Sequence, residues 1–285
     1  MSHATGSTLC CRSSNLQPDL LAPSFDYRVV DGLGRARQRG GVPQLGGAVF
    51  RAETLGPAVE LAHLESGISI DDLHGQDWLE RGSLAPILSA LASAQQQWLA
   101  PDGQRGLILG SGMVGEAVLN SFKIDAHKAA LAAGFVKPAL LVAAMGELIG
   151  NVIDHSEAIG SGVAMFSAEA GRFEFVVADT GIGALPSLTR NPDHASLSDD
   201  GAALLAMVEA GVSRFARNSG HGNGFRPIFE KLADMSGHLR FRSGGYGLTL
   251  DGCFGNRIAR QIAQKPKLRG LLAAVTCLAP KTAGR

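Results

Sequence analysis

Hydrophobic and polar positions alternate most regularly between residues 138 and 180. From Pro138 to about His155 the apolar residues recur at helical spacing, which predicts a long amphipathic helix. Pro138 suits the first helical turn, where its missing N–H leaves no hydrogen bond unmade. Two β-type runs follow, at 162–167 and 172–179, and the residues 168–171 between them predict a hairpin. The apolar face of the helix consists of Leu141, Met145, Leu148 and Val152.

The remainder of the second half alternates between helical and extended patterns. Residues 184–219 predict a polar loop followed by an amphipathic helix, and residues 226–235 predict a further helix. Strands are predicted at 238–243 and 246–250, then a loop rich in Gly and basic residues, then a last strand at 271–278. This order predicts an α/β fold, specifically a two-layer α/β sandwich in which a mixed sheet carries helices on one face.

The first half has weaker patterns. Residues 1–26 are small and polar without a period, so we expect a disordered tail. Residues 27–41 predict a loop with one short strand, 46–52 a strand and 55–64 a helix. A better helix is expected at 83–99, with Ser83 as its N-cap. We therefore divide the chain into the tail, an α+β region at 27–130 without an assigned function, and a domain at 131–282.

Composition excludes several classes of protein. The 285 residues contain 26 Lys plus Arg and 26 Asp plus Glu, so no net field favours nucleic acid or an anionic membrane. No apolar run is long enough to span a bilayer, and the N-terminus lacks a secretory pattern, so we expect a cytoplasmic protein. The four cysteines have no C-x-x-C spacing, which argues against a zinc site.

Candidate chemistry begins on the polar face of the helix predicted at 138–155. Glu147, Asn151, Asp154 and His155 fall on one side of it, away from the apolar face. A carboxylate, an amide oxygen and an imidazole one turn apart can hold a hydrated divalent cation, orient a water and meet a phosphate. A solvated helix face carries the same residue types, so this pattern alone leaves both interpretations open.

Two glycine-containing segments follow in the chain. Phe173–Gly183 predicts a buried strand that ends at Asp179, followed by a turn in which Gly181 and Gly183 permit tight backbone. The second segment, S-G-H-G-N-G-F, precedes the helix predicted at 226–235, and its glycines leave backbone N–H groups free to face a phosphate. Its candidate binding residues are Gly220, His221, Gly222, Asn223 and Gly224.

The order E-x-x-x-N, D-x-G-x-G and G-x-G-x-G resembles the N box and the two glycine boxes of the Bergerat-fold (GHKL) ATPase superfamily. The resemblance covers residues 138–280 and is closest to the histidine-kinase-like and anti-sigma-factor-kinase-like members. It implies a Bergerat fold, with ATP and Mg²⁺ as cofactors and residues 184–219 as an ATP lid. The topoisomerase, chaperone and repair branches fit less well, because only about sixty residues follow Gly224.

The resemblance also implies roles for individual residues. Asn151 would be the ligand of Mg²⁺, and Glu147 would be the catalytic carboxylate that activates a water or an acceptor side chain. His155 would lie near the phosphates, and Asp179 would accept a hydrogen bond from the adenine amino group. Gly181 and Gly183 would let the backbone approach the base, and the second glycine box would close over the phosphates. One departure is the Gly-Thr pair common in the family, in whose place this chain has Gly270 and Leu271.

Three functions follow from these patterns. The first is a kinase-like signalling protein that binds Mg-ATP and transfers phosphate to, or gates, a partner protein. The second is a non-catalytic interaction module for which ATP is a conformational ligand. The third is an NAD-binding oxidoreductase that uses the G-x-G-x-x-G of Gly110–Gly115, although no acidic residue follows at the required distance. The partner, the acceptor residue and a possible homodimer are left open by the sequence.

Overall fold

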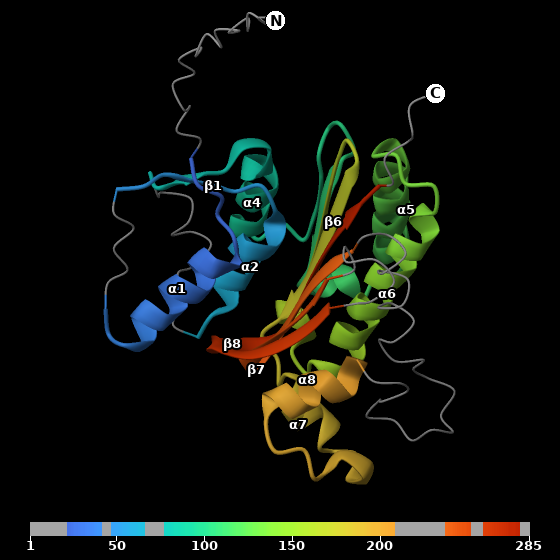
Figure 1. The fold of residues 1–285 in the computed structure, drawn as a ribbon. Helices are drawn as coiled ribbons and strands as arrows, with labels where there is room; N and C mark the ends of the chain where they lie inside the picture. Colours follow the sequence, from blue (N-terminus) through green and yellow to red (C-terminus); the bar gives the residue numbers. More distant parts are fainter. Residues whose placement is uncertain (1–21, 42–46, 66–76, 209–236, 252–258, 280–285) are drawn as a thin grey trace, which may run out of the picture.

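In the computed structural model, which describes residues 22–41, 47–65, 77–208, 237–251 and 259–279, a six-stranded sheet lies at the centre (Figure 1). Its strand order is β3-β4-β5-β6-β8-β7, and each neighbouring pair is antiparallel. The α/β class is confirmed, whereas a mixed sheet was wrong for these strands. The strands are β3 Gln97–Leu99, β4 Arg105–Leu109, β5 Val163–Glu169, β6 Arg172–Asp179, β7 His238–Asp251 and β8 Ala259–Leu278.

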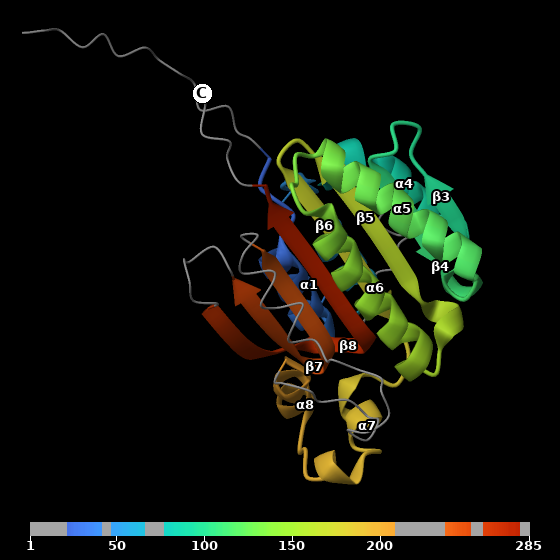
Figure 2. The ribbon, with the colours of Figure 1, turned by 90° about the vertical axis from the view of Figure 1, so that its right-hand side faces the viewer.

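Helices cover both faces of this sheet (Figures 1 and 2). One face carries α5 Glu116–Ala132, α6 Pro138–His155, α7 Ala184–Leu188 and α8 Asp200–Val208. The opposite face carries α1 Tyr27–Gln38, α2 Leu55–His63 and α4 Ala85–Ala92. The described helices of the domain predicted at 131–282, which are α6, α7 and α8, lie on one face as expected, and helices of the N-terminal region cover the opposite face.

Strand β6 shows the physical basis of this three-layer arrangement. Phe173, Phe175 and Val177 join the core under α5 and α6, whereas Val176 and Ala178 join the core under α1, α2 and α4. Successive side chains of a strand point to opposite faces, so a run such as Phe175–Ala178, which is apolar at four successive positions, needs a cover on each face. This run is the sequence signal for a helix layer on both sides of the sheet.

The sheet takes strands from both sides of residue 131. Strands β3 and β4 precede it and pair next to β5, and α5 packs on α6. The boundary predicted between 130 and 131 thus falls inside α5, which continues to Ala132. A two-residue parallel pair, β1 (Phe50–Arg51) with β2 (Leu79–Glu80), lies apart from the main sheet.

Helix α1 occupies most of the segment that was expected to be a loop. Asp26 caps it by accepting hydrogen bonds from the backbone N–H groups of Arg28 and Val29. Glycines in this segment suggested a loop, but a Cβ at Gly34 would lie 2.5 Å from Cβ of Pro266, so that glycine permits close packing of α1 on β8. Residues 22–26 are also ordered, with Phe25 buried against Trp78, whereas residues 1–21 of the predicted tail lie outside the described part.

Other predictions had mixed outcomes. Those of α2, α6, β5 and β6 are confirmed within one or two residues. The helix expected at 83–99 extends only over α4, and Ser83 donates a hydrogen bond to Glu169 rather than capping it. Strands β7 and β8 are longer than expected: β7 continues through an irregularity at Gly244, and residues 259–270, expected to be a loop, belong to β8.

A buried group of charges fastens the α1 and α2 layer to the sheet. The Arg240 guanidinium donates to Asp31 at 2.9 Å and to Glu60 at 2.8 Å, and Arg242 also pairs with Glu60. Asp31 pairs in addition with Lys265. Each of the four Asp, Glu and Arg side chains is at most 5% exposed, so their charges are neutralised by one another rather than by water.

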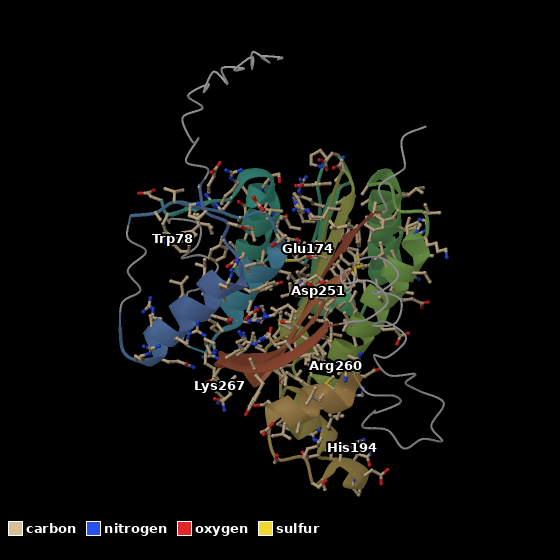
Figure 3. All side chains as sticks on the ribbon, in the orientation of Figure 1. Trp78, Glu174, His194, Asp251, Arg260 and Lys267 are labelled. Carbon is tan, nitrogen blue, oxygen red and sulfur yellow. The ribbon has the colours of Figure 1, made fainter. Side chains whose placement is uncertain are left out.

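Glu174 makes a second connection to this layer (Figure 3). Its carboxylate accepts from the backbone N–H groups of Leu55 at 2.7 Å and Gly56 at 2.9 Å, which are the first residues of α2. Burial nevertheless raises the pKa of Glu174 to about 7, because the loss of hydration outweighs these hydrogen bonds. No described helix has the length and apolar character needed to cross a membrane.

Candidate functional site

The candidate site begins at Asp179, the last residue of β6. Its side chain is 2% exposed, and its Oδ1 accepts a hydrogen bond from the backbone N–H of Gly181 at 2.7 Å. The backbone N–H of Leu271, its neighbour on β8, also hydrogen-bonds to the carboxylate. Burial raises the pKa of Asp179 to about 6, an effect that the two N–H donors reduce. A carboxylate thus lies at the end of a central strand with its charge only partly compensated.

The two glycines of the predicted turn are required by the backbone around them. A Cβ at Gly181 would lie 2.0 Å from the carbonyl oxygen of Ser156. Gly183 has φ of +76°, a conformation that side chains other than glycine rarely adopt, and a Cβ there would lie 2.7 Å from Oγ of Ser243. The D-x-G-x-G segment therefore forms a tight turn packed against two other segments.

Two residues near Asp179 were not predicted as site residues. Ser243 is fully buried; its Oγ donates to the carbonyl of Gly270 at 3.0 Å and accepts from the N–H of Ala184 at 2.9 Å. Gly270 has φ of +66°, and a Cβ there would lie 2.1 Å from the carbonyl oxygen of Asp179. Gly270 stood out in the sequence only as a departure from the Gly-Thr pair, and Ser243 gave no signal because it lies inside a strand.

The same turn contacts the C-terminal end of α6. The N–H of Ile182 donates to the carbonyl oxygen of Ser156 at 3.0 Å, and the N–H of Thr180 donates to Oγ of Ser161 at 3.0 Å. Asn151 lies five residues before Ser156, which corresponds to about 7.5 Å along the helix axis. The structure thus brings the end of the polar helix and the Asp179 turn to one end of the sheet.

Asn151 and Glu147 lie one turn apart on α6. The side-chain nitrogen of Asn151 donates to the backbone carbonyl of Glu147 at 2.8 Å. Because that contact uses the NH₂ end of the amide, the amide oxygen is turned away from the helix backbone, as a cation ligand would need. Glu147 is exposed and His155 is partly exposed in the last turn of the same helix.

The second glycine box and part of the expected lid lie outside the residues that the structure describes. Gly220, His221, Gly222, Asn223 and Gly224 lie outside the described residues, as does the helix predicted at 226–235. The described part of the expected lid, residues 184–208, contains α7 and α8 and a short 3₁₀ turn at Pro192–His194. It contacts β7 directly, since the N–H of Gly245 donates to Asp200 at 3.3 Å.

The glycines at 110–115 have a local structural explanation. Gly110 and Gly112 lie in a 3₁₀ turn, Gly110–Met113, between β4 and α5, and Gly115 is the N-cap residue of α5. A Cβ at Gly110 would lie 2.8 Å from the carbonyl oxygen of Gly160. The dinucleotide fingerprint belongs to a parallel βαβ unit, whereas β4 pairs antiparallel with β5, the next strand of the chain. A turn before a helix accounts for this motif.

Comparison with protein-family models, with curated proteins and with solved structures gives no match. Within the described residues, no group of three or more His, Cys, Asp or Glu side chains is arranged to hold a metal ion. An ion bound here would therefore need oxygen ligands from another source, such as the phosphates of a nucleotide, in addition to Asn151.

Proposed function

We propose that this protein binds Mg-ATP at the end of the sheet where α6 meets the Asp179 turn, and that it acts as a kinase-like signalling protein on a partner protein. The observation that carries the proposal is the buried Asp179 carboxylate, held by the N–H of Gly181 beside the end of the helix that bears Asn151. An adenine amino group would offer this carboxylate a further donor. Guanine has an oxygen acceptor at the same position and would leave the carboxylate unpaired.

The proposed Mg²⁺ site is based on the polar side chains of α6. The amide oxygen of Asn151 faces away from its helix and is a suitable ligand for Mg²⁺, which keeps several waters and bridges phosphates. Bound Mg²⁺ would neutralise charge on the phosphates. Glu147, one turn earlier and exposed, is the carboxylate available to accept a proton from a water or an acceptor hydroxyl.

Two functions would use this nucleotide site: phosphoryl transfer, in which ATP is converted to ADP, and ATP-gated binding of a partner, in which ATP stays intact. In the first case Glu147→Gln would abolish transfer and preserve ATP binding, because the substitution removes the proton acceptor but no ligand of the nucleotide. In the second case ATP would remain intact after long incubation with the wild-type chain. Detection of ADP by chromatography, in the presence of Mg²⁺, separates the two.

Nucleotide binding is tested by thermal unfolding with ATP, GTP and NAD, each with and without Mg²⁺. We expect ATP with Mg²⁺ to raise the unfolding temperature, because a ligand that binds only the folded state stabilises it. Asn151→Ala should reduce the additional rise in unfolding temperature that Mg²⁺ gives in the presence of ATP. Gln97→Ala, which removes an exposed amide from the edge strand β3, should leave the shift unchanged. Equal shifts with all three nucleotides, or none with ATP, would refute the proposal.

A further inference from the structure

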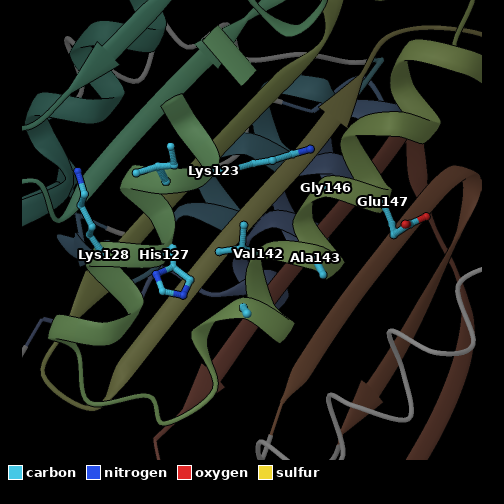
Figure 4. Close-up of a pocket in the computed structure, with 9 residues that line it drawn as sticks. Lys123, His127, Lys128, Val142, Ala143, Gly146 and Glu147 are labelled. Atoms are coloured by element: carbon cyan, nitrogen blue, oxygen red, sulfur yellow. The ribbon is translucent and has the colours of Figure 1, made fainter. Parts of the chain in front are cut away.

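A groove on the outer surface of the layer formed by α5 and α6 is separate from the Asp179 turn. It lies between α5 and α6, is open to solvent and has a volume of about 730 Å³; we call it the α5–α6 groove (Figure 4). The lining residues are Lys123, Ile124, His127, Lys128, Ala139, Val142, Ala143, Gly146 and Glu147. Its floor on α6 is made of small or apolar residues, whereas α5 contributes the cations.

Lys123 shows how the groove is built. Its side chain lies across α6 at Gly146, where an added Cβ would stand 3.2 Å from Cε and 3.4 Å from Nζ of the lysine. Figure 4 shows Lys123 reaching from α5 toward Gly146, with Glu147 beyond it. Within the described part of the chain Lys123 makes no ion pair, so its charge is available to a ligand.

The groove carries more positive than negative charge. Lys128 pairs with Asp125 at 3.6 Å, but its side chain is 72% exposed, so water screens that contact strongly. His127 lies between the two lysines and adds a further donor. Glu147 is the one carboxylate among the lining residues, and it lies at one end.

Apolar side chains continue this surface along α5. Ile124 is 54% exposed and Leu131 is 58% exposed, and they lie seven residues apart on one face of the helix. His127 and Lys128 lie between them on the same face. Large apolar residues at heptad-like spacing flanked by cations are the complement of an amphipathic helix that carries carboxylates beside its apolar stripe.

We propose that the α5–α6 groove docks an acidic amphipathic helical segment of a partner protein. A second copy of the chain fits less well, because a symmetric contact through this face would place one net-positive surface against another. An anionic bilayer would bring negative charge against Glu147, the carboxylate among the lining residues, whereas a helical segment can carry its own carboxylates beside the lysines alone. Charge complementarity therefore favours a protein segment.

The position of Glu147 connects this groove to the candidate nucleotide site. Glu147 lines the groove, and Asn151 lies one turn further along the same helix. A segment docked in the groove would therefore have one end beside the residues assigned to Mg-ATP. This connection rests on the proposed function, whereas docking itself does not.

The test uses fluorescein-labelled synthetic peptides and fluorescence anisotropy, without nucleotide. One peptide is a helix-forming sequence with leucines on one stripe and glutamates beside it, and its counterpart has lysines in place of the glutamates. We expect saturable binding of the acidic peptide, weakened about tenfold or more by Lys123→Glu with Lys128→Glu. The same pair of substitutions should improve binding of the lysine peptide. Ala143→Trp, which fills the groove without changing its charge, should also weaken binding of the acidic peptide about tenfold.

The matched control is Arg35→Glu with Arg37→Glu, which changes net charge equally on exposed positions of α1, in the other helix layer. This control should alter acidic-peptide binding by less than about twofold. The proposal is overturned by equal weakening in the control, by equal binding of both peptides to the wild-type chain, or by no saturable binding. A dimer that Ala143→Trp dissociates, or binding to phosphatidylglycerol vesicles without binding to the acidic peptide, would also overturn it.

Two further measurements keep the outcomes distinct. Circular dichroism and thermal unfolding establish that each variant is folded. If Ala143→Trp does not fold, the double substitution of Lys123 and Lys128 tests the proposal by itself. The ATP-induced thermal shift is recorded on the same variants. If the peptide binds but ATP does not raise the unfolding temperature, the docking proposal holds and the nucleotide site is refuted. If ATP raises the unfolding temperature but the peptide does not bind, the nucleotide site holds and the docking proposal is refuted.

Discussion

Replacement of Asp179 by Asn should change the pH dependence of stability in a direction set by the burial of that carboxylate. The pKa of Asp179 is raised from an ordinary 3.8 to about 6, so the folded state binds a proton that the unfolded state has released between these values. The free energy of unfolding of the wild-type chain therefore falls as pH rises from about 3.8 to about 6 and levels off above it. At about 1.4 kcal/mol for each pH unit, the contribution is about 3 kcal/mol.

The assay is urea unfolding of the wild type and Asp179→Asn between pH 4 and 8. The asparagine cannot ionise, so the stability of the variant relative to the wild type should increase by up to about 3 kcal/mol between pH 4 and 7. Other titrating groups, including Glu174, cancel in this difference because both proteins contain them. A difference that stays constant with pH, or that moves in the wild type's favour as pH rises, would refute the assignment of a destabilised buried charge.

Three further predictions concern the same framework. Glu60→Gln leaves two buried arginines without their shared carboxylate and should lower the free energy of unfolding by about 3–5 kcal/mol in urea. Glu174, with a pKa of about 7, should make stability fall between about pH 4.5 and 7, and Glu174→Gln should remove this slope; a slope that persists would contradict it. Gly270→Ala places a Cβ on the Asp179 carbonyl at positive φ and should cost about 2 kcal/mol or more, whereas Gly245→Ala, with open space around it, should cost far less.

The elements predicted best from sequence are those whose own pattern determines them. Helix α6 combines Pro138 at its start with a regular apolar face, and the β5–β6 hairpin has two apolar runs around a short turn. Helix α1 was missed because its glycines suggested a loop. Gly34 is instead required by Pro266, more than 230 residues away in the chain, and no local pattern contains that information.

The layer formed by α1, α2 and α4 and parts of the site depend on long-range contacts. Arg240 and Arg242 are basic residues in a strand, which sequence alone would place on a solvated edge, yet both are buried against acidic residues of α1 and α2. Asp179, Gly181 and Gly183 could be named from one contiguous segment. Ser243 could not, because its role depends on the approach of β7 to Gly270 and Ala184.

The central claim is that Asp179 recognises adenine within a Mg-ATP site. Isothermal titration calorimetry of ATP and GTP with Mg²⁺, on the wild type and Asp179→Asn at pH 7.5, measures it directly. We predict that ATP binds the wild type, that GTP binds at least tenfold more weakly, and that Asp179→Asn reduces ATP affinity at least tenfold while remaining folded. Absence of ATP binding to the wild type, or equal ATP affinity in the two proteins, would contradict the account.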